Sequence, residues 1–309
     1  MLTGYLGESA AVGTSLLWTL SAIAWSHAGQ RIGSNAVTAT RSLLAVLLLA
    51  GVHLLAYGTL LPQGGDAATL SWLALSGITG FGLGDLCFFR ALKLIGPRVG
   101  MTVLCTSPLL TALLAAMPPL HETPGPIVWA GIAITIIGML AVVLEEPCEK
   151  AWQQDRRQVL RGVLWAVLGS ALFSIGFVLS RMGVGDHLGA PVTPLSATLM
   201  RVLFGTLAIW LLLPLFGTLG ETLRSFRNRR SMTIVVAGTV VGPVIGIWLS
   251  MVAFQKAETG VATALISTGP IFMLMLSHWS HGERPTLRGV AGVLLAVAGV
   301  AMLVLRNSL

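Results

Sequence analysis

Long apolar runs cover most of the chain, and they are interrupted at short intervals by glycine, proline and charged residues. A helix needs about 20 mostly apolar residues to cross a bilayer, and ten segments reach that length. The connections between them are mostly short and polar. The pattern therefore predicts an all-α membrane protein with ten transmembrane helices. We expect these helices at 8–28, 35–57, 68–92, 97–118, 126–144, 161–183, 193–216, 232–254, 260–279 and 287–305.

The longest polar connection, EEPCEKAWQQDRRQVLR (145–161), lies near the middle, and the segments on its two sides match at an offset of 160–162 residues. Because the matches keep the same order along both halves, they indicate an internal duplication. We expect a first five-helix repeat over 1–145, a cytoplasmic linker over 146–160 and a second five-helix repeat over 161–309. The matched pairs include Arg41 with Arg201, Gly80 with Gly242, Gly84 with Gly246, Pro108 with Pro270, and Glu122 with Glu283.

The odd number of spans in each repeat has a geometric consequence. Five crossings place the second copy in the bilayer upside down, so a pseudo-two-fold axis in the membrane plane relates the two repeats. Transporters built in this way bind their substrate near the midplane, between the repeats. The duplication therefore predicts two inverted repeats around a shared chamber.

Composition agrees with a membrane environment. Of the 309 residues, 55% are hydrophobic and 10% are charged, whereas about 25% are charged in a typical soluble domain. So few charges cannot cover a surface that faces water, so the main solvent and partner is the lipid bilayer. The net charge of +7 does not indicate nucleic acid, because the basic residues form short clusters between apolar runs, as membrane loops do.

The same clusters predict an orientation. With ten spans, the side that holds both termini carries three basic residues, and the other side carries fourteen. Basic loops stay in the cytoplasm. We therefore expect a multi-pass protein of the plasma (inner) membrane with the linker inside and both termini outside.

Several features recur at matching places in the two halves. An arginine lies in the second and seventh spans (TATRS, LMRVL), a proline in the fourth and ninth, a glutamate just after each of those, and glycines seven apart in the fifth and tenth. In this order they resemble the drug/metabolite transporter superfamily, EamA-like branch, over nearly the whole chain. The resemblance implies a secondary transporter, often an exporter of small metabolites, without an ATP-binding domain. Members usually keep both termini inside, unlike the orientation that the charges predict here.

Asp85 is the most unusual candidate, because an aspartate in a membrane helix costs roughly 2.5–3.5 kcal/mol on insertion scales. Its counterpart in the second half is Ile247, so the duplication does not explain it. We hypothesise that Asp85 couples transport to a proton or binds substrate, with Arg41 as its partner. The alternative is a purely structural ion pair.

Prolines and aromatic residues supply the other substrate-binding candidates. Pro108 and Pro270 are expected within helices, where each frees a backbone carbonyl, although they can also serve as packing kinks. Tryptophans with nearby hydroxyls suit a pocket for a partly apolar solute, and residues of the membrane interface are the alternative. The candidates are Trp18, Ser21, Trp25, Thr106, Pro108, Trp248, Ser250, Thr268 and Pro270.

Four further charged residues are expected to have structural or coupling roles. We expect Arg41 and Arg201 to donate hydrogen bonds to loop carbonyls, and we expect Glu122 and Glu283 to order the loops after the fourth and ninth spans. Glycines four apart, at Gly80-xxx-Gly84 and Gly238-xxx-Gly242-xxx-Gly246, predict close helix contacts.

Two other function classes remain open at this point. GLGD (82–85) fits the GxGD signature of intramembrane aspartyl proteases, but that chemistry needs two carboxylates that share a proton, and Asp186 in the second copy, GVGD, is expected on the other side of the membrane. A lipid flippase, scramblase or membrane scaffold is the third class. The sequence contains no motif for a metal or a cofactor, so we expect a transporter that is not an enzyme.

Overall fold

The computed structural model describes residues 5–143, 156–184, 192–215, 217–272, 276 and 287–305. These residues are almost entirely helical, with an isolated β-bridge between Gly64 and Val192. The elements are α1 (Leu6–Ile32), α2 (Ser34–Tyr57), α3 (Ala67–Ser76), η2 (Gly77–Gly84), α4 (Asp85–Leu104), α5 (Ser107–Ala115), α6 (Pro126–Val143), α7 (Arg156–Val184), α8 (Pro194–Leu212), α9 (Leu219–Ser225), α10 (Arg229–Thr239), η3 (Val240–Gly246), α11 (Ile247–Lys256), α12 (Thr259–Ile266) and α14 (Leu287–Leu305).

Glycines and capping side chains set several helix ends. Gly33 (φ 84°) separates α1 from α2, and Gly58 (φ 76°) ends α2 in the left-handed region that glycine adopts without strain. At the start of α3, Asp66 Oδ1 accepts the backbone N–H of Thr69 at 2.8 Å. This hydrogen bond holds the pKa of the Asp66 carboxyl below its usual value, so the carboxyl is ionised near neutral pH.

Apolar helices of membrane-spanning length account for much of the described chain. Six segments are long and apolar enough to cross a bilayer, and Pro126–Ala141 and Thr259–Phe272 are shorter apolar helices. Of the two remaining predicted spans, α1 covers 8–28, and the end of α4 with α5 lies within 97–118, but the total of ten spans stays a prediction. The six long segments are Asn35–Tyr57, Ala67–Ala91, Arg156–Val184, Pro194–Leu212, Arg229–Lys256 and Leu287–Leu305.

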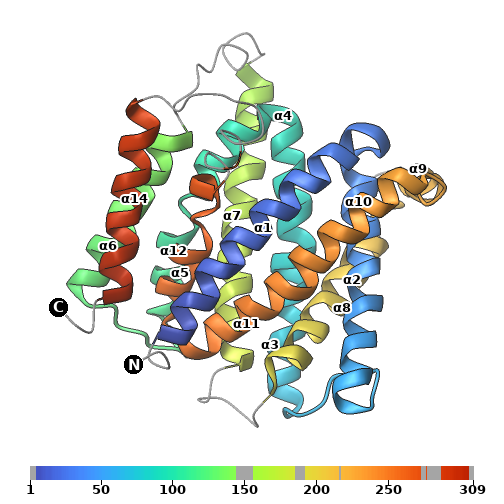
Figure 1. Cartoon of the computed structure of the whole chain (residues 1–309), viewed down its shortest axis with the longest axis horizontal. Coiled ribbons are helices and arrows are strands. Elements are labelled where there is room, and N and C mark those ends of the chain that lie inside the picture. The colour runs from blue at the N-terminus through green and yellow to red at the C-terminus, as the bar shows by residue number, and fades with distance from the viewer. Residues whose placement is uncertain are drawn as a thin grey trace.

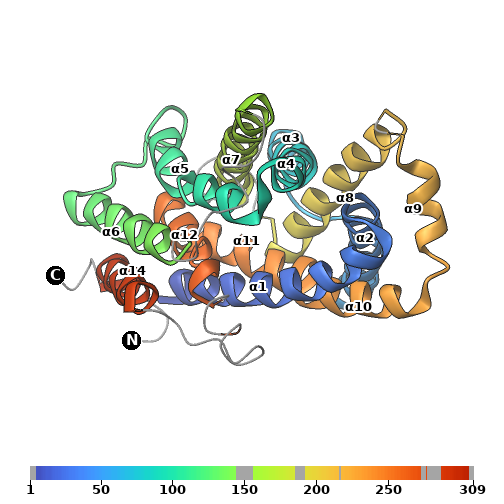
Figure 2. The same ribbon diagram turned by 90° about the horizontal axis from the view of Figure 1, so that it is seen from above.

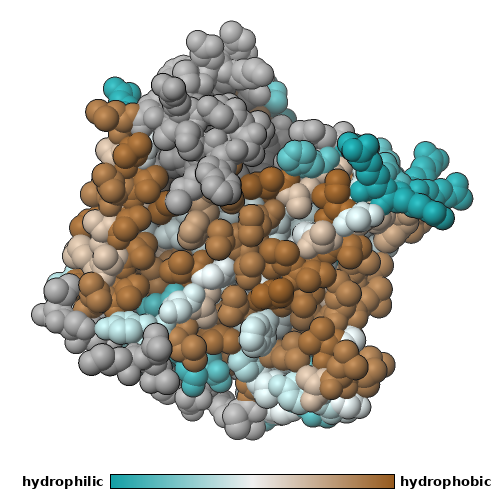
Figure 3. Space-filling model, viewed as in Figure 1, coloured by the Kyte–Doolittle hydropathy of each residue, from teal (hydrophilic) through white to brown (hydrophobic). Residues whose placement is uncertain are grey.

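The outer surface has the polarity that a bilayer requires. Figure 3 shows apolar residues across the middle of the viewed face and a hydrophilic group over α9 and the start of α10. Exposed basic side chains account for that group, and a basic cluster at one end of a helical protein is typical of the water interface. Its residues are Arg224, Arg227, Arg229 and Arg230.

The two halves of the chain, α1–α6 and α7–α14, exchange equivalent contacts. Helix α1 packs along α10, η3 and α11, and α7 packs in the matching way along α3, η2 and α4. Figure 2 shows these two groups on opposite sides of the molecule. In addition, α2 contacts α8, α5 contacts α12, and α6 contacts α14. Each half contacts the other through an equivalent set of helices, which is the arrangement that a two-fold axis produces.

Matching helices run in opposite directions, as inversion requires. Gly138 of α6 lies against Ala296 of α14, whereas Gly131 lies against Leu303, so the two helices are antiparallel. Figure 1 shows α1 beginning and α14 ending at the lower side, while α6 ends and α7 begins at the upper side. The last helices of the two halves therefore have the inverted relation predicted from the odd number of spans.

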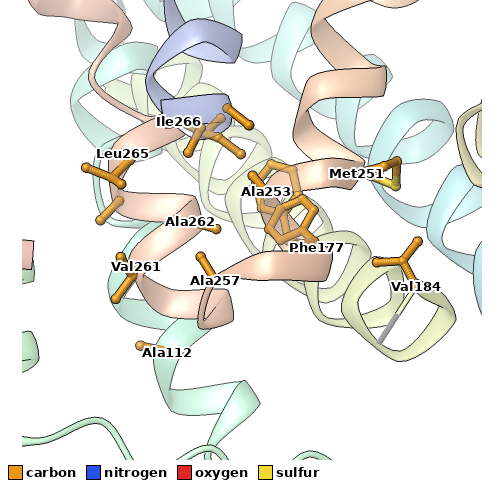
Figure 4. Packing of buried hydrophobic residues seen from close by; sticks show 14 of the residues in the cluster. Ala112, Phe177, Val184, Met251, Ala253, Ala257, Val261, Ala262, Leu265 and Ile266 are labelled. Atoms are coloured by element: carbon orange, nitrogen blue, oxygen red, sulfur yellow. The ribbon is translucent and has the colours of Figure 1, made fainter. Parts of the chain in front are cut away.

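A continuous apolar core connects the halves. Phe177 of α7 packs against Phe254 of α11, with ring centroids 5.2 Å apart. Figure 4 shows buried side chains of α5, α7, α11 and α12 converging on this region. The labelled members are Ala112, Phe177, Val184, Met251, Ala253, Ala257, Val261, Ala262, Leu265 and Ile266.

The π-helical segments η2 and η3 occupy matching places in the two halves, and such segments are frequent at functional sites. Glycines let the neighbouring helices approach η2 closely. A Cβ atom on Gly176 of α7 would lie 2.7 Å from the Cα of Gly80, which is backbone and cannot rotate away. This contact between the two halves therefore requires glycine.

Gly176→Ala tests that contact. We expect the added methyl to push α7 away from η2 and lower the free energy of unfolding by about 1–3 kcal/mol, measured as a lower melting temperature in detergent. Gly51→Ala in α2 is the matched control, because a Cβ there meets no atom within 4 Å. Equal melting temperatures for the two variants would contradict the close packing.

Candidate functional site

Two helix breaks occur at matching positions, near the prolines predicted to bind substrate. Helix α4 ends at Leu104, and α5 begins at Ser107 with Pro108 in its first turn. In the second half α12 ends at Ile266, and the chain is helical again over 269–272, which includes Pro270. The prolines therefore start new helical segments, where a missing N–H costs nothing. The expectation that they lie in mid-helix and kink it is wrong in this respect.

Hydroxyl groups from the opposite half lie against each break. In the first half, the Ser107 and Ser174 hydroxyls lie 3.2 Å apart, and Ser174 belongs to α7. In the second half, the Thr268 hydroxyl donates to Ser15 Oγ of α1 at 3.0 Å. Thr19 Oγ1 of the same helix lies 3.3 Å from the Gly269 carbonyl oxygen. Each half thus supplies polar partners for the interrupted helix of the other.

The two threonine candidates at the breaks, Thr106 and Thr268, differ in exposure. Pro270 is buried, as is Thr268, of which 3% is exposed. Thr106 is exposed, and its hydroxyl donates to the Val103 carbonyl at 2.6 Å, within its own helical turn. Thr268 is therefore enclosed at the second break, while Thr106 faces the surface at the first break.

Asp85 forms an ion pair with Arg41, as expected if the second and third spans touch. Asp85 is the first residue of α4, directly after η2, and Arg41 lies about two turns from the start of α2. The Arg41 guanidinium carbon lies 4.3 Å from the centroid of the Trp25 ring, a cation–π contact that strengthens where water is excluded. Asp85 is paired with an arginine, and no second carboxylate forms a hydrogen bond with it among the described residues. Asp186 lies outside the described residues.

Arg201 is the second buried arginine of the site. It lies in α8 with 4% of its surface exposed, and it interacts electrostatically with Asp85. Its guanidinium lies beside Gly80 of η2 and 5.5 Å from the Phe177 ring centroid. Neither arginine bonds to loop carbonyls in the described residues, unlike the prediction. Both instead interact with the same carboxylate.

The aromatic candidates of α1 lie in a helix–helix contact. Trp25, Ser21 and Trp18 follow one face of the helix and fit over Gly238, Gly242 and Gly246, in that order. A Cβ atom on Gly242 would lie 2.5 Å from Ser21 Oγ. The glycines spaced four apart are therefore used for packing, and these α1 side chains fill the space above them.

The two α11 candidates point in different directions. Trp248 is 39% exposed, whereas Ser250 is buried and its hydroxyl donates to the Ile247 carbonyl at 2.7 Å. Among the described residues, neither forms a hydrogen bond with the charged group or with the helix breaks, so their binding roles stay predictions.

Glu122 joins the two halves at the end where α1 begins. Its Oε2 accepts the Thr259 backbone N–H at 2.8 Å, and its Oε1 accepts the Thr259 hydroxyl at 2.7 Å, so it caps α12. Arg181 of α7 donates to Glu122 Oε1 at 3.2 Å and to the Gln255 carbonyl at 3.0 Å. Glu122 therefore orders the start of α12 in the second half as well as its own loop. Glu283, its counterpart in the second half, lies outside the described residues.

A hollow of about 280 Å³ lies between α3, α5 and α7. None of its lining residues was predicted to bind substrate, so it is not the expected chamber. Its wall is largely apolar, which suits a hydrocarbon group. The lining residues are Trp72, Leu114, Met117, Pro118, Pro119, Ile175, Val178, Leu179 and Met182.

Sequence reasoning missed Arg181 and Ser174. Arg181 carried a signal, because a lone basic residue in the last turn of an apolar helix needs a buried acceptor or the water interface. Ser174 carried almost none, since hydroxyls in membrane helices commonly bond to their own backbone.

The arrangement defines a polytopic helical membrane protein with two inverted halves that meet at broken helices and a buried charged group. The sequence pattern of the EamA-like transporter family matches residues 5–144 and 160–305. The chain therefore belongs to the EamA-like transporter family and is a membrane transporter.

Two individual proteins are also similar. The probable 4-amino-4-deoxy-L-arabinose-phosphoundecaprenol flippase subunit ArnE of Erwinia tasmaniensis is 34% identical over 78 residues, which are 25% of this chain and 70% of that protein. A solved structure, described only as a crystal structure of a protein, superposes with a TM-score of 0.73 at 20% identity, covering 96% of this chain and 95% of that one. The solved structure supports the fold alone.

Glu122→Gln tests the connection between the halves. We expect the variant to lose about 1.5–3 kcal/mol of stability, because hydrogen bonds to a charged acceptor weaken and the new amide N–H₂ faces other donors. Thermal unfolding in detergent measures the loss. Glu221→Gln on the exposed α9 is the control and should change stability by less than about 0.5 kcal/mol; an equal effect in both variants would exclude a structural role for the cap.

Proposed function

We propose that the chain is a secondary transporter that exports small metabolites or drugs across the plasma membrane by alternating access. The observation that carries the proposal is the matched pair of helix breaks, each next to hydroxyls of the opposite half. Breaks of this kind expose backbone groups inside the membrane, and transporters use them at substrate sites between inverted repeats. In this proposal ten spans form repeats over 1–145 and 161–309, joined by a linker over 146–160.

The contacts between the halves suit a rocking motion. Most of them are glycine contacts, apolar side chains and single hydroxyl hydrogen bonds, which can be exchanged at small cost. The Glu122–Arg181–Thr259 group contains charge-assisted hydrogen bonds and ties the halves at one end. Opening at that end would break it, so it would contribute to the barrier between the two access states.

The predicted substrate residues gain unequal support. Asp85 is supported by its burial beside two arginines, and Thr268, Pro108 and Pro270 by their places at the breaks. Trp18, Ser21 and Trp25 serve helix packing, and we propose that they shape the wall of the chamber. Thr106, Trp248 and Ser250 stay in the proposal on the sequence alone.

A flippase of lipid-linked substrates is the second candidate function. The similarity to ArnE favours it, because that protein is described as a flippase subunit whose substrate is attached to phosphoundecaprenol. The apolar hollow between α3, α5 and α7 would suit part of a lipid chain.

Proteoliposomes test the transport proposal. Wild-type protein should move members of a metabolite library down their gradients without ATP, at rates that differ between pH 6 and pH 8. In Asp85→Asn we expect the pH dependence to be lost, if that carboxyl couples a proton. Asp66→Asn is the control, because Asp66 stays ionised at both pH values and asparagine can also cap a helix. An Asp85→Asn variant that transports as wild type does at both pH values would remove the coupling role, and ATP-dependent uptake would contradict a secondary transporter.

The proposed orientation has a separate test. Arg31, Arg156 and Arg229 lie at the same end of the helices, opposite Arg181 and Lys256, which supports both termini outside. A green fluorescent protein fused to the C-terminus should therefore be dark in an intact cell, because it does not fold after export, whereas alkaline phosphatase fused there should be active. The reverse result would place the termini in the cytoplasm.

A further inference from the structure

The charged group in α2, α4 and α8 is not balanced. Arg41 and Arg201 carry two positive charges, since arginine stays protonated in proteins, and Asp85 supplies one negative charge when ionised. Among the described residues, no second carboxylate pairs with either arginine. Arg41 is 6% exposed and Arg201 is 4% exposed. A net positive charge held inside a membrane protein is costly unless a partner neutralises it.

Hydrogen bonding is incomplete in the same place. Nε of Arg41 and both Nε and Nη1 of Arg201 are buried and have no acceptor among the described residues. A buried donor without an acceptor costs free energy, and a guanidinium presents its donors as a planar fork that matches two oxygens at once. On Arg201, Nε and Nη1 lie on different edges of the guanidinium, and each forms a two-donor edge together with Nη2. The unmet donors therefore match an oxyanion that can accept two hydrogen bonds.

Aromatic rings surround the two guanidinium groups. Trp25, Phe81 and Phe89 lie 4.3, 5.7 and 5.5 Å from the Arg41 guanidinium carbon, and Phe177 lies 5.5 Å from that of Arg201. Rings at these distances offer the guanidinium N–H groups no strong acceptor, so those donors stay available to a ligand. They also keep water away, which strengthens the attraction between unlike charges.

We propose that Arg201, assisted by Arg41, binds a single oxyanionic group of the transported substrate, either a carboxylate or a phosphodiester. This inference rests on the proposed function, because the ligand is the transported molecule. One such group carries one negative charge, which neutralises the cluster while Asp85 remains paired with Arg41. Gly80 allows this geometry, since its missing side chain leaves room for the Arg201 guanidinium.

The test measures anion binding without transport. Purified protein in a neutral detergent is unfolded thermally in increasing sodium acetate, with sodium chloride at equal ionic strength as the reference. We expect a saturable rise in melting temperature with acetate beyond that with chloride, since a carboxylate offers each of two N–H groups its own oxygen and chloride is a single acceptor atom. General salt effects also stabilise proteins, but they do not saturate and do not depend on one arginine.

Variants identify the site. Arg201→Gln should raise the apparent dissociation constant for acetate about tenfold or more, and Arg227→Gln on the exposed basic surface should leave it unchanged. Arg201→Lys keeps the charge and loses the fork, so it should also weaken binding and replaces Arg201→Gln if that variant does not fold. Asp85→Asn removes the carboxylate that competes with acetate for the arginines, so we expect it to tighten acetate binding. If Asp85 served only to hold Arg41 in place, the substitution would not tighten binding.

A second arm separates the two sources of the oxyanion. Phosphatidylglycerol, an anionic phosphodiester lipid, is titrated against phosphatidylcholine at a fixed lipid-to-detergent ratio. An Arg201-dependent shift with acetate alone indicates a soluble carboxylate, and one with phosphatidylglycerol alone indicates a lipid headgroup; a shift with both supports the shared chemistry. The inference is overturned if no saturable shift depends on Arg201, or if Asp85→Asn weakens binding.

The two proposals fail separately. Transport in proteoliposomes without any Arg201-dependent binding would remove the anion site and leave the transporter. Arg201-dependent binding without transport of any solute would leave the site and remove the transport proposal.

Discussion

The interior of a bilayer offers neither water nor counterions, so every polar group in the core of this protein must find its partner in the protein itself. Continuous helices meet that requirement within one segment. Interrupted helices do not, and here the interruptions occur where α1 and α7 supply hydroxyls from the other half. The same requirement explains why Asp85 and Arg41 are paired across two helices and why the unmet donors of Arg201 stand out.

The two-fold relation between the halves governs packing but not chemistry. Both halves place a π-helical segment at the matching position and pack it against the first helix of the other half. The surfaces used differ: α7 brings Gly176 to Gly80, whereas α1 brings Trp18 and Trp25 to glycines of α10 and η3. Asp85 has an isoleucine as its counterpart. Among the described residues, a symmetric scaffold therefore carries a charged group that its two halves do not share equally.

Distance along the chain explains which parts of the site sequence reasoning found. The Arg41–Asp85 pair joins neighbouring spans, so helix order alone made it a reasonable expectation. Arg201 reaches the same carboxylate from the seventh predicted span, and the repeat suggested only that it would resemble Arg41. Trp18 and Trp25 were assigned to a pocket because they are aromatic and have hydroxyls nearby in the sequence, but those features do not show that their face of α1 meets glycines.

Segment polarity, the duplication and the odd number of spans are properties of the linear chain, and they were enough to predict a helical membrane protein with inverted halves. Apolar runs specify their solvent directly, because each segment must match the thickness of a bilayer whatever its neighbours are. Only the tertiary structure decided that the prolines begin new helices, that Glu122 caps a helix of the other half, and that two arginines share one aspartate. Those outcomes depend on contacts between residues 44 to 253 positions apart, and such contacts are fixed by how small and large side chains fit between helices, which no local pattern records.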